Sequence, residues 1–176
     1  RYYIHFSTHY NYCIYLYTYS QYFLVLYINA LIQEINAFSS TETIKTIYLG
    51  GGTPSSLNIE LLKDLFNFLS KYKDSNTEFT IEVNPESVTR EKLQLFKDYG
   101  INRISIGMQT SNDELLKLLN RCSHKTFLDA YSLIREFDFK NINIDLMYAL
   151  PNEGDDQVKK DLEVMLALNP SHISTY

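Results

Sequence analysis

Apolar runs of strand length alternate with helix-patterned segments along the whole chain. This order is typical of βαβ units, in which the strands form a parallel sheet and the connecting helices cover it. The sequence therefore predicts an α/β fold. The expected strands are Tyr2–Phe6, Thr46–Leu49, Glu78–Val83, Arg103–Met108, Ile142–Leu146 and His172–Tyr176.

The segments between these strands carry helix signals. Ser111–Glu114 reads Ser-Asn-Asp-Glu, which has the composition of a capping box and predicts Ser111 as the N-cap of a helix running through Leu119. Between Tyr10 and Tyr19, tyrosine occupies many alternate positions, a pattern typical of strands. Helices are expected at Tyr22–Phe38, around Leu61–Leu69, around Leu93–Phe96, and at Ser111–Leu119, Lys125–Phe137 and Asp155–Leu168.

Composition excludes several classes of protein. A length of 176 residues with 45% hydrophobic residues is typical of one globular domain. A net charge of −5 without clusters of Lys or Arg argues against nucleic acid and anionic membranes as partners. The longest apolar run, Tyr22–Ile32, is shorter than the roughly 20 residues that a transmembrane helix needs.

The cysteines and the two ends of the chain bear on its cellular context. Cys13 and Cys122 lie in no paired motif, which favours a reducing compartment such as the cytosol or an organelle matrix, the mitochondrion included. The chain starts at Arg1 without a basic-then-apolar leader, so any targeting region is expected outside it. An uncovered parallel strand ending at Tyr176 would be an aggregation hazard, so residues 1–176 are expected to be the front part of a larger protein.

A glycine-rich turn follows the second expected strand. Gly50-Gly51-Gly52-Thr53-Pro54 comes directly after Thr46–Leu49. Glycine lacks a Cβ atom and tolerates positive φ, so successive peptide N–H groups of such a turn can point toward an anion or a carboxylate. By itself the turn fits either a backbone-binding loop or a tight connection between a strand and a helix.

Polar residues mark the ends of three further strands. Glu82 lies at the end of its strand, Gln109 follows Met108, and Asp145 lies at the end of Ile142–Leu146, while Arg121 lies in the segment after Gln109. Parallel α/β folds place their ligands at the carboxyl ends of the strands. These residues are therefore expected to converge with the glycine-rich turn on one cleft.

Four motifs in a fixed order carry a resemblance to a known family. They are Gly-Gly-Gly-Thr-Pro, Glu-Val-Asn-Pro, Asn-Arg-Ile-Ser-Ile-Gly-Met-Gln and Asn-Ile-Asp-Leu-Met. With them the chain resembles the radical S-adenosylmethionine (SAM) family of oxygen-independent coproporphyrinogen III oxidase. Within this family its motifs are more similar to those of the HemW-type heme chaperone branch.

The resemblance implies a fold and a set of site residues. The fold is a partial (β/α)6 radical SAM barrel over residues 1–176, in which a Cys-x3-Cys-x2-Cys loop after the first strand holds a [4Fe–4S] cluster and SAM binds the open iron. The implied SAM contacts are Gly51, Gly52 and Thr53 at the methionine end, Glu82 and Asp145 at ribose or amino groups, and Gln109, Arg121, Tyr3 and Tyr15 around them.

The segment of this chain that aligns with the cluster-binding motif departs from the family pattern. Aligned from Tyr3, it places His9, Cys13 and Leu16 where three cysteines are expected. Leu16 has no donor atom, whereas three thiolates are needed to hold three irons. His9 and Cys13 could hold two corners of a labile cluster, could bind another metal together with His5, or could belong to a packed aromatic segment. Their spacing matches no closed zinc pattern.

The resemblance implies a HemW-like protein in heme handling or porphyrin biosynthesis, with heme or porphyrin and heme-acceptor proteins as partners. Its chemistry would be reductive cleavage of SAM to a 5′-deoxyadenosyl radical. An oxygen-independent coproporphyrinogen III oxidase is one alternative. A non-catalytic nucleoside- or heme-binding protein that has lost the cluster is another, and a decaying product without a stable fold is a third.

Overall fold

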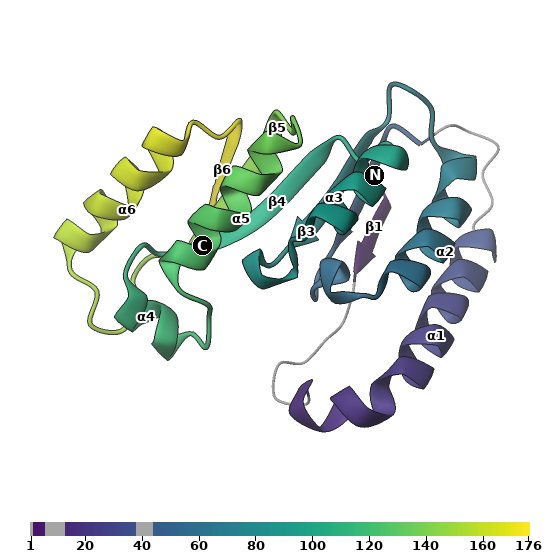
Figure 1. The fold of residues 1–176 in the computed structure, drawn as a ribbon, viewed down its shortest axis with the longest axis horizontal. Coiled ribbons are helices and arrows are strands. Elements are labelled where there is room, and N and C mark those ends of the chain that lie inside the picture. The colour runs from purple at the N-terminus through teal and green to yellow at the C-terminus, as the bar shows by residue number, and fades with distance from the viewer. Residues whose placement is uncertain (1, 6–12, 38–43) are drawn as a thin grey trace.

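The chain forms one parallel sheet whose six strands lie in the sheet in the same order as in the sequence (Figure 1). In this computed structural model the described residues are 2–5, 13–37 and 44–176, with side chains described for 24–37 and 44–176. Every neighbouring pair of strands is parallel. The strands are β1 (Tyr2–His5), β2 (Thr46–Gly50), β3 (Glu78–Val83), β4 (Arg103–Gln109), β5 (Asn141–Leu146) and β6 (His172–Thr175).

This topology confirms the predicted α/β fold. Each expected strand is present, and no strand end differs from the prediction by more than one residue, which is within the usual variation of element boundaries. Because consecutive parallel strands are neighbours, the sheet is part of a β/α barrel. The carboxyl ends of all these strands therefore lie at one edge of the sheet.

The helices connect the strands, and α3 and α5 lie over the sheet while α1 lies beside α2 (Figure 1). Asn58 caps α2 by accepting a hydrogen bond from Leu61 N at 2.9 Å, and Thr89 caps α3 in the same way through Lys92 N. The helices are α1 (Cys13–Ala37), α2 (Ile59–Leu69), α3 (Arg90–Asp98), α4 (Asp113–Leu118), α5 (His124–Glu136) and α6 (Asp155–Leu168), with short 3-10 turns at η2 (Pro54–Ser56), η3 (Ser70–Tyr72) and η4 (Pro85–Ser87).

Two local predictions were wrong. Helix α1 starts at Cys13 rather than Tyr22, so the alternating tyrosines from there on are helical. The residues between them include Ile14 and Leu16, so the stretch lacks the alternation of apolar and polar residues that specifies a strand. The N-cap of α4 is Asn112, whose side chain accepts hydrogen bonds from Glu114 N and Leu115 N, and not Ser111.

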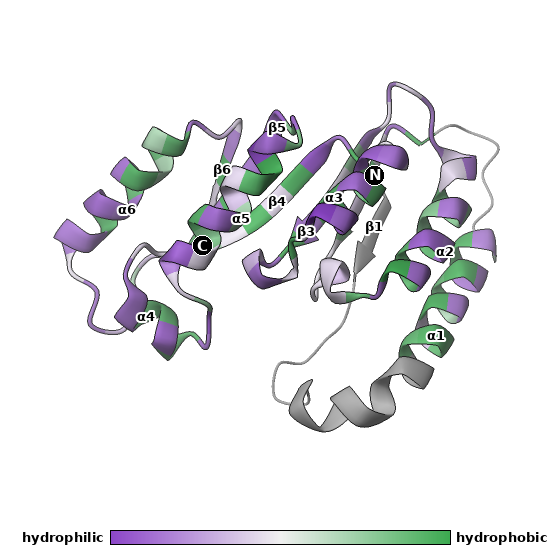
Figure 2. Cartoon of the chain, viewed as in Figure 1, coloured by the Kyte–Doolittle hydropathy of each residue, from purple (hydrophilic) through white to green (hydrophobic). Residues whose placement is uncertain are grey.

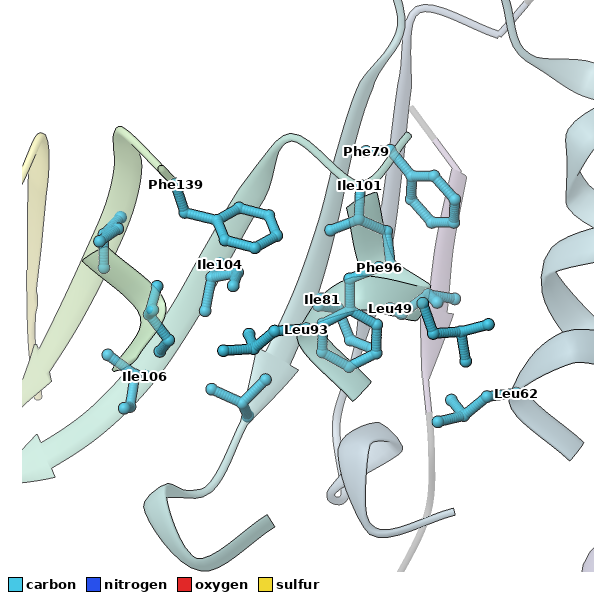
Figure 3. Packing of buried hydrophobic residues seen from close by; sticks show 14 of the residues in the cluster. Leu49, Leu62, Phe79, Ile81, Leu93, Phe96, Ile101, Ile104, Ile106 and Phe139 are labelled. Atoms are coloured by element: carbon cyan, nitrogen blue, oxygen red, sulfur yellow. The ribbon is translucent and has the colours of Figure 1, made fainter. Parts of the chain in front are cut away.

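The two faces of the sheet differ in polarity. Alternate residues of β2 to β5 are apolar and almost completely buried, and they form one core with buried residues of α2, α3 and α5. Figure 3 shows Leu62 of α2 and Leu93 and Phe96 of α3 beside the strand residues of this core. Figure 2 shows that these helices carry both hydrophobic and hydrophilic residues, as expected for helices that cover a sheet on one side only. The strand residues of this core are Ile47, Leu49, Phe79, Ile81, Val83, Ile104, Ile106, Met108, Ile142, Ile144 and Leu146.

Aromatic rings fill the core between α2, α3 and the sheet. Phe66 of α2 makes edge contacts with Phe79 of β3 and Phe96 of α3, with ring centroids 5.9 and 6.0 Å apart. This packing holds the amino end of β3 against its covering helices. No helix in the described ranges combines the length and apolarity that crossing a membrane requires.

Candidate functional site

The opposite face of the sheet carries polar residues in rows across the strands. Glu82, Ser105, Asn143 and His172 lie in register on β3, β4, β5 and β6. Two residues nearer the carboxyl edge, and therefore on the same face, Gly107, Asp145 and Ser174 form a second row. Since side chains alternate along a strand, each of these residues lies between core residues and faces away from the helices. The polar face thus belongs to the inside of the partial barrel.

Glu82 is fixed by two hydrogen bonds from β2 and the turn that follows it. Tyr48 donates its hydroxyl hydrogen to Oε1 at 2.7 Å, and the Gly51 N–H donates to Oε2 at 2.8 Å. Gly51 has φ 105°, a conformation that favours glycine. Burial, together with the hydrogen bond to Glu82, raises the pKa of Tyr48 well above its usual range, so the phenol stays protonated and keeps donating.

This arrangement refines the prediction for the glycine-rich turn. The turn was expected to direct its N–H groups toward a ligand, but the Gly51 N–H binds the carboxylate of Glu82. The Gly51 N–H of this turn therefore orients the Glu82 side chain and does not point toward a ligand. Each oxygen of that carboxylate accepts one of these bonds and retains further lone-pair capacity for a ligand.

Asp145 is oriented by Asn143, a buried residue of the same strand. Asn143 Nδ2 donates to Asp145 Oδ1 at 2.7 Å and to Ser105 Oγ at 2.8 Å. Asn143 Oδ1 accepts from Ser174 Oγ at 3.0 Å and from His172 Nδ1 at 2.5 Å. All the hydrogen-bonding capacity of the amide is used, so its orientation is fixed and it holds the carboxylate of Asp145 in place.

The two carboxylates lie close enough to influence each other. Burial raises the pKa of Asp145, the negative charge of Glu82 raises it further, and the hydrogen bond from Asn143 opposes this rise. A pair of partly buried carboxylates on one polar face is a favourable environment for a cationic or hydroxyl-rich ligand.

A second chain of hydrogen bonds connects the loops after β2 and β3 with the turn after α4. Asn84 Nδ2 donates to Thr53 Oγ1 at 3.0 Å, and Arg121 donates from its guanidinium to Asn84 Oδ1 at 3.0 Å. Asn84 therefore links two residues that the sequence predicted to share a cleft. Asn84 and Arg121 also line one small cavity with Gln109 and Cys122.

Gln109 lies at the end of β4 above Gly107. Its φ is 67°, an uncommon conformation for a residue other than glycine, and its side chain is largely buried. A Cβ atom on Gly107 would overlap Gln109 Nε2, so the missing side chain at Gly107 makes room for the amide. The backbone of the next strand supports this end, because Met147 N–H donates to Gln109 O at 2.9 Å.

For the predicted site residues near the start of the chain, the structure describes the backbone of some and the side chain of none. Tyr3 pairs with Tyr48 in the register of β1 and β2, and Tyr15 lies on α1, but neither side chain is described. His9 lies outside the described residues, and Cys13 is the first residue of α1. Within the described ranges, no three or more His, Cys, Asp or Glu residues form a group that could hold a metal ion.

Sequence reasoning missed three residues that hydrogen-bond to the predicted site residues, namely Tyr48, Asn84 and Asn143. Each lies two positions from a residue that was singled out: Tyr48 from Gly50, Asn84 from Glu82, and Asn143 from Asp145. Two positions along a strand correspond to the same face. The strand period could therefore have identified Tyr48 and Asn143, whereas Asn84 lies just beyond its strand.

Comparisons with known proteins identify relatives of this chain. The chain is 39% identical to the heme chaperone HemW of Bacillus subtilis over 157 residues, which cover 85% of this chain and 41% of that protein. HemW of Lactococcus lactis gives 39% over 153 residues, covering 85% and 40%. The chain thus spans about two fifths of the length of these relatives.

The fold itself matches a solved radical SAM enzyme. The structure resembles coproporphyrinogen III oxidase (HemN) of Escherichia coli with a TM-score of 0.79 and 29% sequence identity, covering 89% of this chain and 38% of that one. Residues 11–165 match the family model of the Radical SAM superfamily. The match to the family model over most of the chain, together with the parallel partial barrel, shows that the chain belongs to the radical SAM superfamily.

Proposed function

We propose that the cleft binds SAM, or a nucleoside derived from it. The observation that carries this proposal is the pair of carboxylates, Glu82 and Asp145, held on one polar face by Tyr48, Gly51 and Asn143. SAM bears a sulfonium and an ammonium group, and its ribose hydroxyls are hydrogen-bond donors. Carboxylates stabilise both kinds of group, since charge-assisted hydrogen bonds are stronger than neutral ones.

The remaining predicted residues complete the proposed pocket. Thr53 and Arg121 are joined through Asn84, and the amide of Gln109 lies at the same small cavity as Arg121. Gly52, in the turn after β2, adds backbone groups without a side chain. The chain would contribute ligand orientation and exclusion of water, which are the protein's usual share in cofactor chemistry.

The residues present do not fit a [4Fe–4S] cluster. Of the three positions where the family has cysteines, this chain has one thiol, at Cys13, and Leu16 in the first turn of α1 offers no donor atom. An iron–sulfur cluster needs thiolates or equivalent donors on its irons. The proposed function therefore includes no redox step.

At the level of the whole protein, we propose a HemW-like role in heme handling, in the cytosol or an organelle matrix. The support is the similarity to proteins named heme chaperones. Such a role would bring heme or porphyrin and heme-acceptor proteins as partners, and it does not require SAM cleavage. The structural match to HemN supports the oxidase alternative more weakly, because the cluster donors are incomplete.

Titration calorimetry with SAM tests the proposed pocket. We expect wild-type affinity in the micromolar to millimolar range, because ordinary hydrogen bonds contribute about 0.5–1.5 kcal/mol each and no iron anchors the ligand. Asp145→Ala should weaken binding about 10- to 100-fold, since bonds to a charged group contribute about 1.5–3 kcal/mol. Asp156→Ala removes the same charge from a fully exposed carboxylate on α6 and should leave affinity unchanged.

Equal binding heats for wild type, Asp145→Ala and Asp156→Ala, with all three folded, would mean that the cleft does not bind SAM through Asp145. S-adenosylhomocysteine, which lacks the sulfonium charge, is a second probe. It should bind more weakly than SAM if the carboxylate pair recognises the cation.

We also expect SAM affinity to depend on pH through Asp145. Its pKa lies above the usual value because of burial and the charge of Glu82. The ionised carboxylate attracts the cation, so affinity should be highest above this pKa and should fall as the pH drops through it. Titrations from about pH 4 to about pH 8 measure this acid limb.

The variant Asp145→Asn identifies the titrating group. Glu82, Tyr48, His172 and Tyr176 also lie near this carboxylate or its amide partner. If Asp145 is responsible, the asparagine variant should bind weakly with a flat profile over the same range. An unchanged acid limb in that variant would assign it to another group.

A further inference from the structure

We propose that Asp161 of α6 is a positioning residue that fixes the turn carrying Gln109, and this inference rests on the proposed SAM pocket. Asp161 is completely buried, with 0% of its surface exposed. Among the described residues it takes part in no salt bridge. A buried carboxylate without a cation is unusual in a protein interior. The hydrogen bonds that Asp161 accepts therefore indicate its role.

One oxygen of Asp161 gathers three hydrogen bonds. Oδ1 accepts from the Ser111 backbone N–H at 2.7 Å, from Ser111 Oγ at 2.5 Å and from Gln157 Nε2 at 2.8 Å. Gln157 also donates to Ser111 Oγ and accepts from Asn112 Nδ2, each at 3.2 Å. The polar side of α6 is therefore attached to two consecutive residues of the turn after β4.

The other carboxylate oxygen of Asp161 makes the buried side chain unfavourable for the stability of the fold. Asp161 Oδ2 is buried and has no hydrogen-bond partner among the described residues. An unpaired buried polar atom destabilises a fold, and an apolar side chain would avoid this. The carboxylate supplies something that an apolar residue cannot, namely an acceptor for the backbone and side chain of Ser111.

Ser111 lies two residues after Gln109, in a turn with little freedom. Gln109 has a positive φ of 67°, and Thr110 N–H donates to Met108 O at 2.9 Å. A non-glycine residue holds such a conformation only where its surroundings impose it. Asp161 fixes the turn on one side through Ser111, and β5 fixes it on the other through the bond from Met147 to Gln109 O.

The consequence concerns the amide of Gln109. Its side chain lies over Gly107 and lines the same small cavity as Arg121 and Asn84. A turn released from α6 would let the backbone at Gln109 relax toward negative φ, which would redirect the amide. Asp161 thus acts on ligand binding through Gln109 without touching the ligand.

A thermodynamic cycle separates this role from general destabilisation. SAM affinity is measured by calorimetry for wild type, Asp161→Leu, Asp161→Asn, Gln109→Ala and the double variant Asp161→Leu/Gln109→Ala. We expect Asp161→Leu to weaken binding about tenfold and Asp161→Asn to stay near wild type, because its amide oxygen still accepts from Ser111. The double variant should bind no more weakly than Gln109→Ala alone.

Two outcomes would overturn the proposal. One is wild-type affinity in Asp161→Leu while Gln109→Ala binds weakly, and the other is a double variant in which the two losses multiply. If Asp161→Leu does not fold, Ser111→Ala and Gln157→Leu each remove part of the attachment and should give smaller losses that also vanish in the Gln109→Ala background.

Amide hydrogen exchange without ligand keeps the inference separate from the proposed function. Asp161→Leu should speed exchange at Ser111, while the amides of α2 should keep their protection. If wild type does not bind SAM but exchange at Ser111 rises in Asp161→Leu, the pocket proposal fails and the fixing of the turn stands. Unchanged exchange at Ser111 in that variant would refute the attachment itself.

Discussion

Anaerobic reconstitution with iron and sulfide is expected to leave the wild-type chain without a stable [4Fe–4S] cluster, whereas the double variant His9→Cys/Leu16→Cys should retain about four irons per chain. The reason is the donor set. Cys13 is the one thiol among the three family positions, and Leu16 has no donor atom. Iron and sulfide counts after desalting, together with the visible absorption of the cluster, measure the difference.

Cys122 provides the matched control for this experiment. It lines the cavity beside Arg121, and burial raises the pKa of its thiol, which disfavours the thiolate that binds iron. Adding Cys122→Ser to the double variant should therefore leave the iron content unchanged. About four irons on the wild-type chain would contradict the prediction, and an iron-free double variant would show that the restored cysteines are not correctly presented.

Gly50→Ala is expected to disrupt the cleft although it adds a single methyl group. A Cβ atom at Gly50 would lie 2.6 Å from Glu82 Oε1 and would also overlap the ring of Tyr48. Both side chains would have to move, which breaks the bonds that hold Glu82. We expect a loss of about 1–3 kcal/mol in the free energy of unfolding from overpacking, and at least about a tenfold loss of SAM affinity.

Gly154→Ala is the control for this substitution. Gly154 precedes α6 with φ −98°, and an added Cβ atom would meet nothing within 4 Å. Calorimetry should therefore give an affinity close to wild type, and urea unfolding should show a loss of at most about 1 kcal/mol, because Gly154 is the N-cap of α6 and alanine is a poorer cap than glycine. If Gly50→Ala leaves the free energy of unfolding and the SAM affinity unchanged, Tyr48 and Glu82 can move without affecting either. The close packing at Gly50 would then not be needed for ligand binding.

The sequence by itself determined the strands, their order and the edge at which the polar residues meet. Ile104, Ile106 and Met108 alternate with polar or small residues, and such a period of two is a local property that fixes which face of β4 is buried. Once parallel strands are separated by helices, their carboxyl ends share one edge. The placement of Glu82, Gln109 and Asp145 at one edge of the sheet was therefore predictable, and their convergence on one binding cleft stays a prediction.

The start of α1 and the cap of α4 were not determined in this way. Alternating tyrosines fit a strand when they are read alone, yet the stretch from Cys13 is helical, and Ser111 fits a capping box although Asn112 is the cap. In the second case a distant residue decided the outcome, because Asp161 of α6 binds both the backbone and the side chain of Ser111. A local pattern gives no information about such a competing partner.

Only the tertiary structure decided how the cleft residues are oriented. The Gly51 N–H could face a ligand or a side chain, and it binds Glu82, which lies 31 positions away in the sequence. Likewise Asn84 joins Thr53 to Arg121, and Asn143 joins β4, β5 and β6 around Asp145. The strand period predicts the face on which such side chains lie, but their hydrogen-bond partners depend on distances that exist only after the strands have been brought together in the sheet.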